Sequence, residues 1–176
     1  EVYCCSDDSD YFMHTETIVE DFDFNYTNQL KGYELLRYSN NKIAPIAFPG
    51  SSFLASPFMF LGIILDKTVE TFLNDSSVLN FKLFFYSMSS VVYFLLSILL
   101  ISKTLKVLDI SFVPIHLLFI SFGTGISYYA FERYSMSHVY EMFASSIIFY
   151  LSSIFYKNKK NNALLTAILP FVLFTG

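Results

Sequence analysis

Cysteine is almost absent from the sequence: there are only two, and they stand side by side at Cys4 and Cys5. Adjacent cysteines rarely bridge each other, because disulfide geometry does not suit neighbouring residues. No Cys or His pattern with metal-ligand spacing surrounds them. We therefore predict no metal ligands here and expect both residues to act as apolar side chains.

Charged residues are also scarce, at 15% of 176, whereas 54% are hydrophobic and the mean hydropathy is +0.49. A chain so apolar and so poor in charge is typical of a protein that has a bilayer as its solvent. Nine of the fifteen acids lie in residues 1–34, where Lys31 is the only lysine or arginine. Because no basic stripe exists to neutralise phosphates, nucleic acid is excluded as a partner.

Long apolar runs fill the second half of the chain and predict a transmembrane domain over residues 83–176. The expected spanning helices are 83–102, 110–131 and 134–156. A fourth run, 163–176, is shorter than the roughly 20 residues of a spanning helix. The sequence also opens without an initiating Met, a basic n-region or a cleavage site. We therefore expect a fragment of a longer membrane protein, with its last helix truncated.

Residues 1–82 are expected to form a large extracytoplasmic loop with juxtamembrane helices. Within it, 43–65 carries no charge but contains Pro45, Pro49 and Pro57. These prolines predict an uninterrupted helix of about ten to fifteen residues, which is short for a span. We interpret this Pro/Gly-rich segment as non-spanning; if it did span, the acidic N-terminal region would lie in the cytoplasm instead.

The loops on either side of 110–156 carry lysines: Lys103 and Lys106 in one, and Lys157, Lys159 and Lys160 in the other. Because two predicted spans separate these loops, both can face the cytoplasm, as the positive-inside rule asks. Arg133, His138 and Glu141 then lie near the opposite, extracytoplasmic face. His138 and Glu141 are three residues apart and share one side of a helix. An ionisable pair near a membrane helix end is either a functional site or an interfacial pair exposed to headgroups and water.

Four short motifs resemble parts of known membrane enzymes. Ser6 to Phe12 reads Ser-Asp-Asp-Ser-Asp-Tyr-Phe, and 19–28 reads Val-Glu-Asp-Phe-Asp-Phe-Asn-Tyr-Thr-Asn. Together they resemble the first outer loop of the GT-C glycosyltransferases, especially the protein-mannosyltransferase-like branch. The Gly/Pro-rich segment 48–58 and the Ser-Met-Ser-His motif ending at His138 are similar to later parts of that family. The resemblance covers about residues 6–150 in order.

The resemblance implies an all-α polytopic membrane protein with a GT-C-like transmembrane helix bundle. Such an enzyme transfers a sugar from a polyprenyl-phosphate donor to an acceptor, which is a glycan, lipid or protein, on the extracytoplasmic face. Carried over, Asp7 matches the family's catalytic acid and Asp8 its acidic neighbour, with Tyr11 in the same motif. A carboxylate within reach can take the proton of the attacking acceptor hydroxyl. Asp10 stands where many relatives have a different polar residue.

The leaving lipid phosphate needs positive or hydrogen-bonding partners, for which Arg133 and His138 are candidates. Tyr11, Arg133, His138 and Glu141 are therefore the expected substrate-binding residues. No cofactor is expected, although the acidic cluster offers the oxygen ligands that suit a divalent cation.

Two other functional classes stay open. One is a transporter or channel fragment, with an outer acidic vestibule and a His138/Glu141 relay. The other is a non-catalytic membrane scaffold. Local evidence also allows Asp7 and Asp8 to be no more than acids at a helix start, where the partial positive charge stabilises them.

Overall fold

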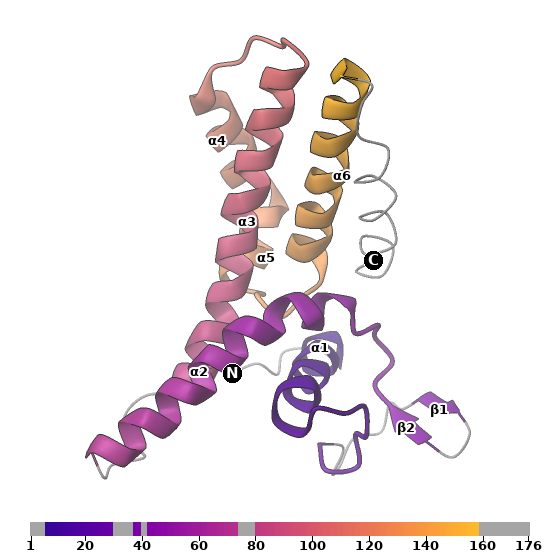
Figure 1. Cartoon of the computed structure of the whole chain (residues 1–176), viewed down its shortest axis with the longest axis vertical. Coiled ribbons are helices and arrows are strands. Elements are labelled where there is room, and N and C mark those ends of the chain that lie inside the picture. Colours follow the sequence, from indigo (N-terminus) through magenta and orange to yellow (C-terminus); the bar gives the residue numbers. More distant parts are fainter. Residues whose placement is uncertain (1–5, 30–36, 40–41, 74–79, 159–176) are drawn as a thin grey trace. The chain divides into compact units, whose positions relative to one another are not determined.

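The computed structural model describes residues 6–29, 37–39, 42–73 and 80–158. The chain divides into two compact units, residues 1–89 and 90–176. The first unit contains α1 (Ser6–Glu16), the π-helical turn η1 (Thr17–Asp21), β1 (Arg37–Ser39), β2 (Lys42–Ala44), α2 (Gly50–Leu73) and the start of α3 (Phe81–Val107). The second contains the rest of α3, α4 (Pro114–Gly123), α5 (Gly125–Phe131) and α6 (His138–Asn158) (Figure 1).

Helices dominate the described residues, as predicted. Three of them, α2, α3 and α6, are long and apolar enough to cross a membrane. The helical class is therefore confirmed, and it is compatible with a helical membrane protein; the short antiparallel pair of β1 and β2 is a small departure. The predicted run 163–176 lies outside the described residues.

Helix α2 is longer than the sequence suggests, and the expected length of ten to fifteen residues is wrong. It runs unbroken for 24 residues with Pro57 inside it. The reason is its starting point: it begins at Gly50, so Pro45 and Pro49 precede the helix rather than interrupt it. Pro57 lacks the N–H for one backbone hydrogen bond and crowds the preceding turn, yet the helix continues past it. Because length and composition alone would now permit a span, the non-spanning interpretation of 43–65 stays a prediction.

Helix α2 exposes large apolar side chains and buries several hydroxyl groups. Its buried face is rich in small and hydroxyl side chains, whereas Phe60, Leu61 and Ile64 are exposed. At Gly62 the helix passes very close to α3, because a Cβ atom there would lie 2.5 Å from the carbonyl oxygen of Phe81. A small residue at such a crossing is typical of packing between membrane helices.

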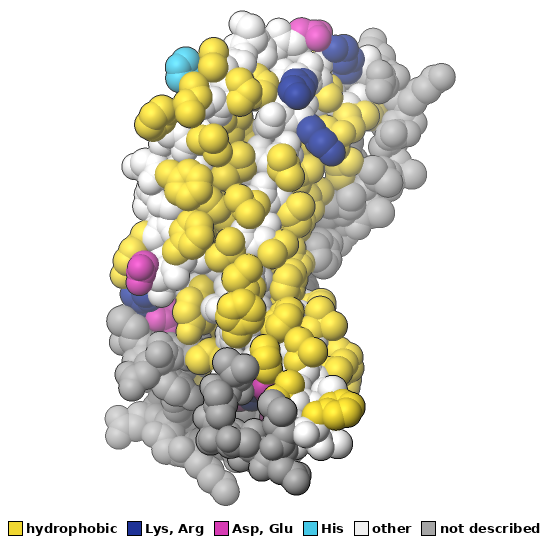
Figure 2. Space-filling model, turned by 90° about the vertical axis from the view of Figure 1, so that its left-hand side faces the viewer, with side chains coloured by type: hydrophobic (Ala, Val, Ile, Leu, Met, Phe, Trp, Pro, Cys, Tyr) yellow, Lys and Arg dark blue, Asp and Glu magenta, His cyan; other side chains and the backbone are white. Residues whose placement is uncertain are grey.

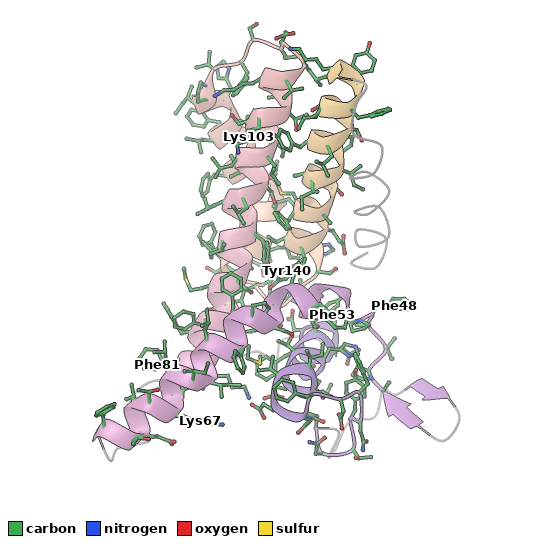
Figure 3. The ribbon with its side chains drawn as sticks, in the orientation of Figure 1. Phe48, Phe53, Lys67, Phe81, Lys103 and Tyr140 are labelled. Atoms are coloured by element: carbon green, nitrogen blue, oxygen red, sulfur yellow. The ribbon has the colours of Figure 1, made fainter. Side chains whose placement is uncertain are left out.

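Asp66, one turn further along α2, supplies the cap of α3. Its two carboxylate oxygens accept the N–H groups of Phe81 and Lys82, both at 2.8 Å. The first N–H groups of a helix have no partner within it and carry a partial positive charge, so a carboxylate satisfies both needs. Figure 3 marks Phe81 at this start of α3.

The predicted helix 83–102 is confirmed within α3, and α6 accounts for most of 134–156. The expectation of one continuous helix over 110–131 is wrong: α4 ends at Gly123, Thr124 is extended, and α5 begins at Gly125. At the break, the Ser127 hydroxyl lies 3.1 Å from the carbonyl oxygen of Phe122 and 3.0 Å from that of Thr124, and its one proton can be donated to either. Hydroxyl groups of this kind make a broken helix tolerable in an apolar setting.

The second unit has two distinct ends. At one end Lys157 of α6 donates to the carbonyl of Val107, the last residue of α3. Towards the other, Ser90 of α3 donates to the carbonyl of Ala130 in α5. Between them lies a core of Phe94, Ile98, Ala130 and Val139. The expectation that the described lysines stand in loops is wrong, because Lys103 and Lys106 lie in α3 and Lys157 lies in α6. The last residues of these two helices meet at one end, as the prediction of a common side requires, and α4 and α5 lead the chain from that end to the start of α6 (Figure 1).

Candidate functional site

Three aspartates of α1 differ sharply in exposure. Asp7 is exposed, whereas Asp8 and Asp10 are each only 2% exposed. Asp7 and Asp8 lie in the first turn of α1, where the sequence placed them. This position suits helix capping as well as chemistry, since the N–H groups at a helix start favour carboxylates. Of the three acids, Asp7 is the one that a molecule from solution can approach.

Asp10 holds the segment before α2 against α1. Its Oδ2 accepts the backbone N–H groups of Ile46 and Ala47, at 2.9 and 3.0 Å. Its Oδ1 has no hydrogen-bond partner among the described residues, so the carboxylate is only partly satisfied. Hydrogen bonds to an ionised group are stronger than neutral ones. Asp10 therefore positions the chain beside the acidic turn, a role that its sequence neighbours did not reveal.

A buried His–Tyr pair supports the same segment. The ring of His14 meets the carbonyl oxygen of Ala47 through Nε2 at 2.9 Å and the hydroxyl of Tyr26 through Nδ1 at 2.7 Å. A carbonyl only accepts, so Nε2 donates, and in a neutral ring Nδ1 accepts the proton of Tyr26. Burial, with the charge of Asp23, raises the pKa of Tyr26 to about 12. The phenol of Tyr26 thus stays protonated at neutral pH and can keep donating its proton to His14.

Tyr11, a predicted substrate-binding residue, links α1 to α2 through its backbone. Its carbonyl accepts the hydroxyls of Ser52 and Thr15, both at 2.8 Å. The Tyr11 side chain is half-buried. Tyr11 therefore lies one helical turn from Asp7 on α1. The hydrogen bond from Ser52 joins this part of α1 to the first turn of α2. Phe53, adjacent to Ser52, marks this start of α2 in Figure 3.

The far end of the acidic helix is anchored to the start of α3. Lys82 pairs with Glu16 at 2.5 Å and with Glu20 at 2.6 Å. Next to this network, the rings of Phe12 and Tyr86 meet edge to face with centroids 5.1 Å apart. The acid-bearing helix is thus fixed to the end of a helix that is long enough to span a membrane.

The second group of predicted residues gathers at the start of α6. His138 Nδ1 lies 3.8 Å from Oε2 of Glu141, which confirms that the two share a face. Ser137 donates to the other carboxylate oxygen of Glu141, and the edge of Tyr129 packs on His138 with ring centroids 4.3 Å apart. Both members of the pair are 42% exposed. Solvent can therefore reach both side chains, while Arg133 lies half-buried in the preceding turn.

The predicted site residues fall into both units of the chain. Asp7, Asp8 and Tyr11 belong to the first, and Arg133, His138 and Glu141 to the second. Each group is brought together within its own unit. Their union in one site stays a prediction.

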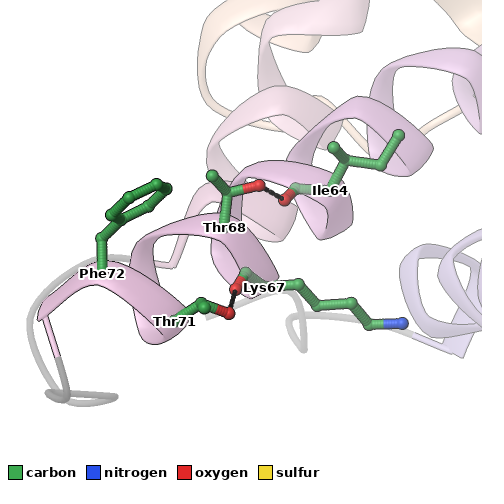
Figure 4. A pocket seen from close by; sticks show the side chains of 5 residues that line it. All are labelled: Ile64, Lys67, Thr68, Thr71 and Phe72. Carbon is green, nitrogen blue, oxygen red and sulfur yellow. Dashed lines mark hydrogen bonds between the residues drawn. The ribbon is translucent and has the colours of Figure 1, made fainter.

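A hollow on the surface of α2 contains none of these residues. It is lined by one face of the helix: Ile64, Lys67, Thr68, Thr71 and Phe72 (Figure 4). The two threonine hydroxyls donate to carbonyls of their own helix, at 2.7 and 2.8 Å. The hollow therefore offers few unused polar groups to a ligand. Among the described residues, no group of three or more His, Cys, Asp and Glu is placed to hold a metal ion.

Comparison of the chain with protein-family models, with curated proteins and with solved structures finds no match. The function must therefore be argued from the geometry of these two groups of residues.

Proposed function

We propose that the protein is an integral membrane glycosyltransferase that moves a sugar from a polyprenyl-phosphate donor to an acceptor on the extracytoplasmic face, with Asp7 as general base. The observation that carries the proposal is the accessibility of Asp7 beside the buried Asp8 and Asp10. A general base must come within hydrogen-bond reach of the hydroxyl whose proton it takes. Among the three aspartates of α1, Asp7 alone is exposed to an approaching hydroxyl.

The anchoring of α1 supports the proposal further. Lys82, at the start of α3, pairs with Glu16 at the end of α1 and with Glu20 in η1, so this end of the acidic helix lies beside the first residues of α3. A lipid-linked sugar presents its anomeric carbon at the boundary of the membrane, because the lipid chain stays in the bilayer. Because the anchored Glu16 is at the opposite end of α1 from Asp7, the proposal requires the whole of this short helix to lie along the boundary.

In the proposed site Arg133 and His138 stabilise the leaving lipid phosphate, and Glu141 keeps the imidazole oriented. This arrangement requires both groups of residues on one face of the membrane. Single cysteines at Thr27 and Glu132, which are exposed, test the requirement in a background without Cys4 and Cys5. Labelling of both in intact cells by an impermeant thiol reagent supports one site. Labelling of Glu132→Cys alone, with Thr27→Cys reacting only after permeabilisation, contradicts it.

The chemistry is tested with Asp7→Asn in membranes supplied with radiolabelled polyprenyl-phosphate mannose. Removal of a general base is expected to slow transfer to membrane acceptors by about 10²- to 10⁴-fold. Glu70→Gln is the matched control, because Glu70 is an exposed acid of the same unit outside the proposed site. Equal transfer by the two variants would contradict the proposal.

A further inference from the structure

The last two turns of α3 carry two lysines with no ion pair among the described residues. Lys103 and Lys106 are both exposed. Lys157, from the adjacent end of α6, is different: it donates to the carbonyl of Val107 at 2.9 Å and pairs with Asp109 at 2.8 Å. The charge of Lys157 is thus used within the protein, whereas the charges of Lys103 and Lys106 face outward.

These lysines continue an exposed apolar strip. Leu96, Leu99, Lys103 and Lys106 are spaced by three, four and three residues, which places them on one face of a helix. Leu96 is 38% and Leu99 is 58% exposed. With a rise of about 1.5 Å per residue, Lys103 lies about 6 Å beyond Leu99 along the helix axis, and Lys106 about 4.5 Å further. Figure 3 marks Lys103 towards this end of α3.

The strip therefore has an apolar body and a cationic end. In Figure 2, Lys and Arg side chains gather at one end of a surface that apolar side chains largely cover. A free phosphate would use the ammonium groups but leave the leucines in water. A phospholipid suits both parts, since its acyl chains are apolar and its phosphate lies at the depth of the headgroups. Lysines near a helix end reach such groups by extending along the helix surface.

We propose that this face of α3 binds an anionic phospholipid, with an acyl chain along Leu96 and Leu99 and the phosphate at the ammonium groups of Lys103 and Lys106. An anionic headgroup is favoured over a zwitterionic one because it carries no cation of its own to repel the lysines. The proposal is independent of the glycosyltransferase assignment, whose residues lie elsewhere. It differs from simple stabilisation of the α3 C-terminus by positive charge, which involves no lipid.

The test uses the protein in bilayer nanodiscs of equimolar phosphatidylglycerol and phosphatidylcholine. Native mass spectrometry of the released protein gives the ratio of the two lipids that stay bound. We expect the wild type to retain phosphatidylglycerol preferentially and Lys103→Gln/Lys106→Gln to lose about fivefold of that preference for each lysine. Lys103→Arg/Lys106→Arg keeps both charges and should retain the preference. Lys67→Gln is the matched control, because Lys67 is an exposed lysine of α2 outside the strip.

Three results would overturn the proposal. One is an unchanged lipid ratio in the double glutamine variant. A second is a loss of about fivefold in Lys67→Gln, the loss expected for each lysine of the double variant, which would show a general effect of net charge. The third is a similar loss in the double arginine variant, which would show that altered packing and not charge controls the ratio. A lowered melting midpoint with an unchanged ratio falls under the first result and assigns the lysines to the helix terminus alone.

Discussion

The close crossing of α2 and α3 predicts a large effect from one methyl group. In Gly62→Ala the new Cβ would lie 2.5 Å from the Phe81 carbonyl oxygen and 2.7 Å from Lys82 Cα. Both are backbone atoms, so no side chain can rotate away and the helices must separate. Overpacking costs about 1 to 3 kcal/mol, whereas alanine in a helix is favoured over glycine by about 1 kcal/mol. Because the contacts are short, the overpacking wins, and we expect a net loss of about 1 to 2 kcal/mol.

The assay is thermal unfolding in detergent, followed by size-exclusion chromatography of the heated protein. For a chain of this size, each kcal/mol moves the midpoint by about 2 to 4 °C, so Gly62→Ala should lower it by about 2 to 8 °C. Gly123→Ala is the matched control, because a Cβ at Gly123 meets nothing within 4 Å. Its midpoint should be unchanged or slightly higher. An equal or higher midpoint for Gly62→Ala than for Gly123→Ala would refute the close approach of α2 to α3.

Two further predictions concern the first unit. Asp66→Ala removes the carboxylate that caps α3 and should cost about 1 to 2 kcal/mol, with a smaller loss for Asp66→Asn; equal stability of Asp66→Ala and wild type by the same assay would contradict the cap. Burial raises the pKa of Tyr26 to about 12 from 10.0, so its protonated form stabilises the fold fully below pH 10, and this stabilisation is lost as the pH rises through 12. The melting midpoint should fall more steeply above pH 10 in the wild type than in Tyr26→Phe, and parallel curves would show that Tyr26 titrates normally.

The predictions that rest on hydropathy and on short-range residue spacing agree best with the structure. Hydropathy and length identified α3 and α6, because a helix that faces lipid must be apolar over a bilayer's thickness. Helical spacing placed His138 and Glu141 on one face. Proline and glycine predicted the helix ends less well. Pro57 does not end α2, whereas the Gly123 to Gly125 stretch does divide α4 from α5. Local rules allow either outcome, and neighbouring hydroxyls and helices decide which one occurs.

The sequence by itself determined that this is a helical protein with three helices long and apolar enough to cross a membrane, and with acids in the first turn of its first described helix, since composition and short-range spacing carry that information. Tertiary structure alone decided what the individual acids do. Asp10 binds backbone that lies 36 and 37 residues away, and Asp66 caps a helix 15 residues ahead. These partners are distant in the sequence and come together only through tertiary packing, so a short stretch of sequence does not predict them. In the same helix Asp10 is buried and Asp7 is exposed. The proposal that Asp7 is the general base rests on this difference in exposure.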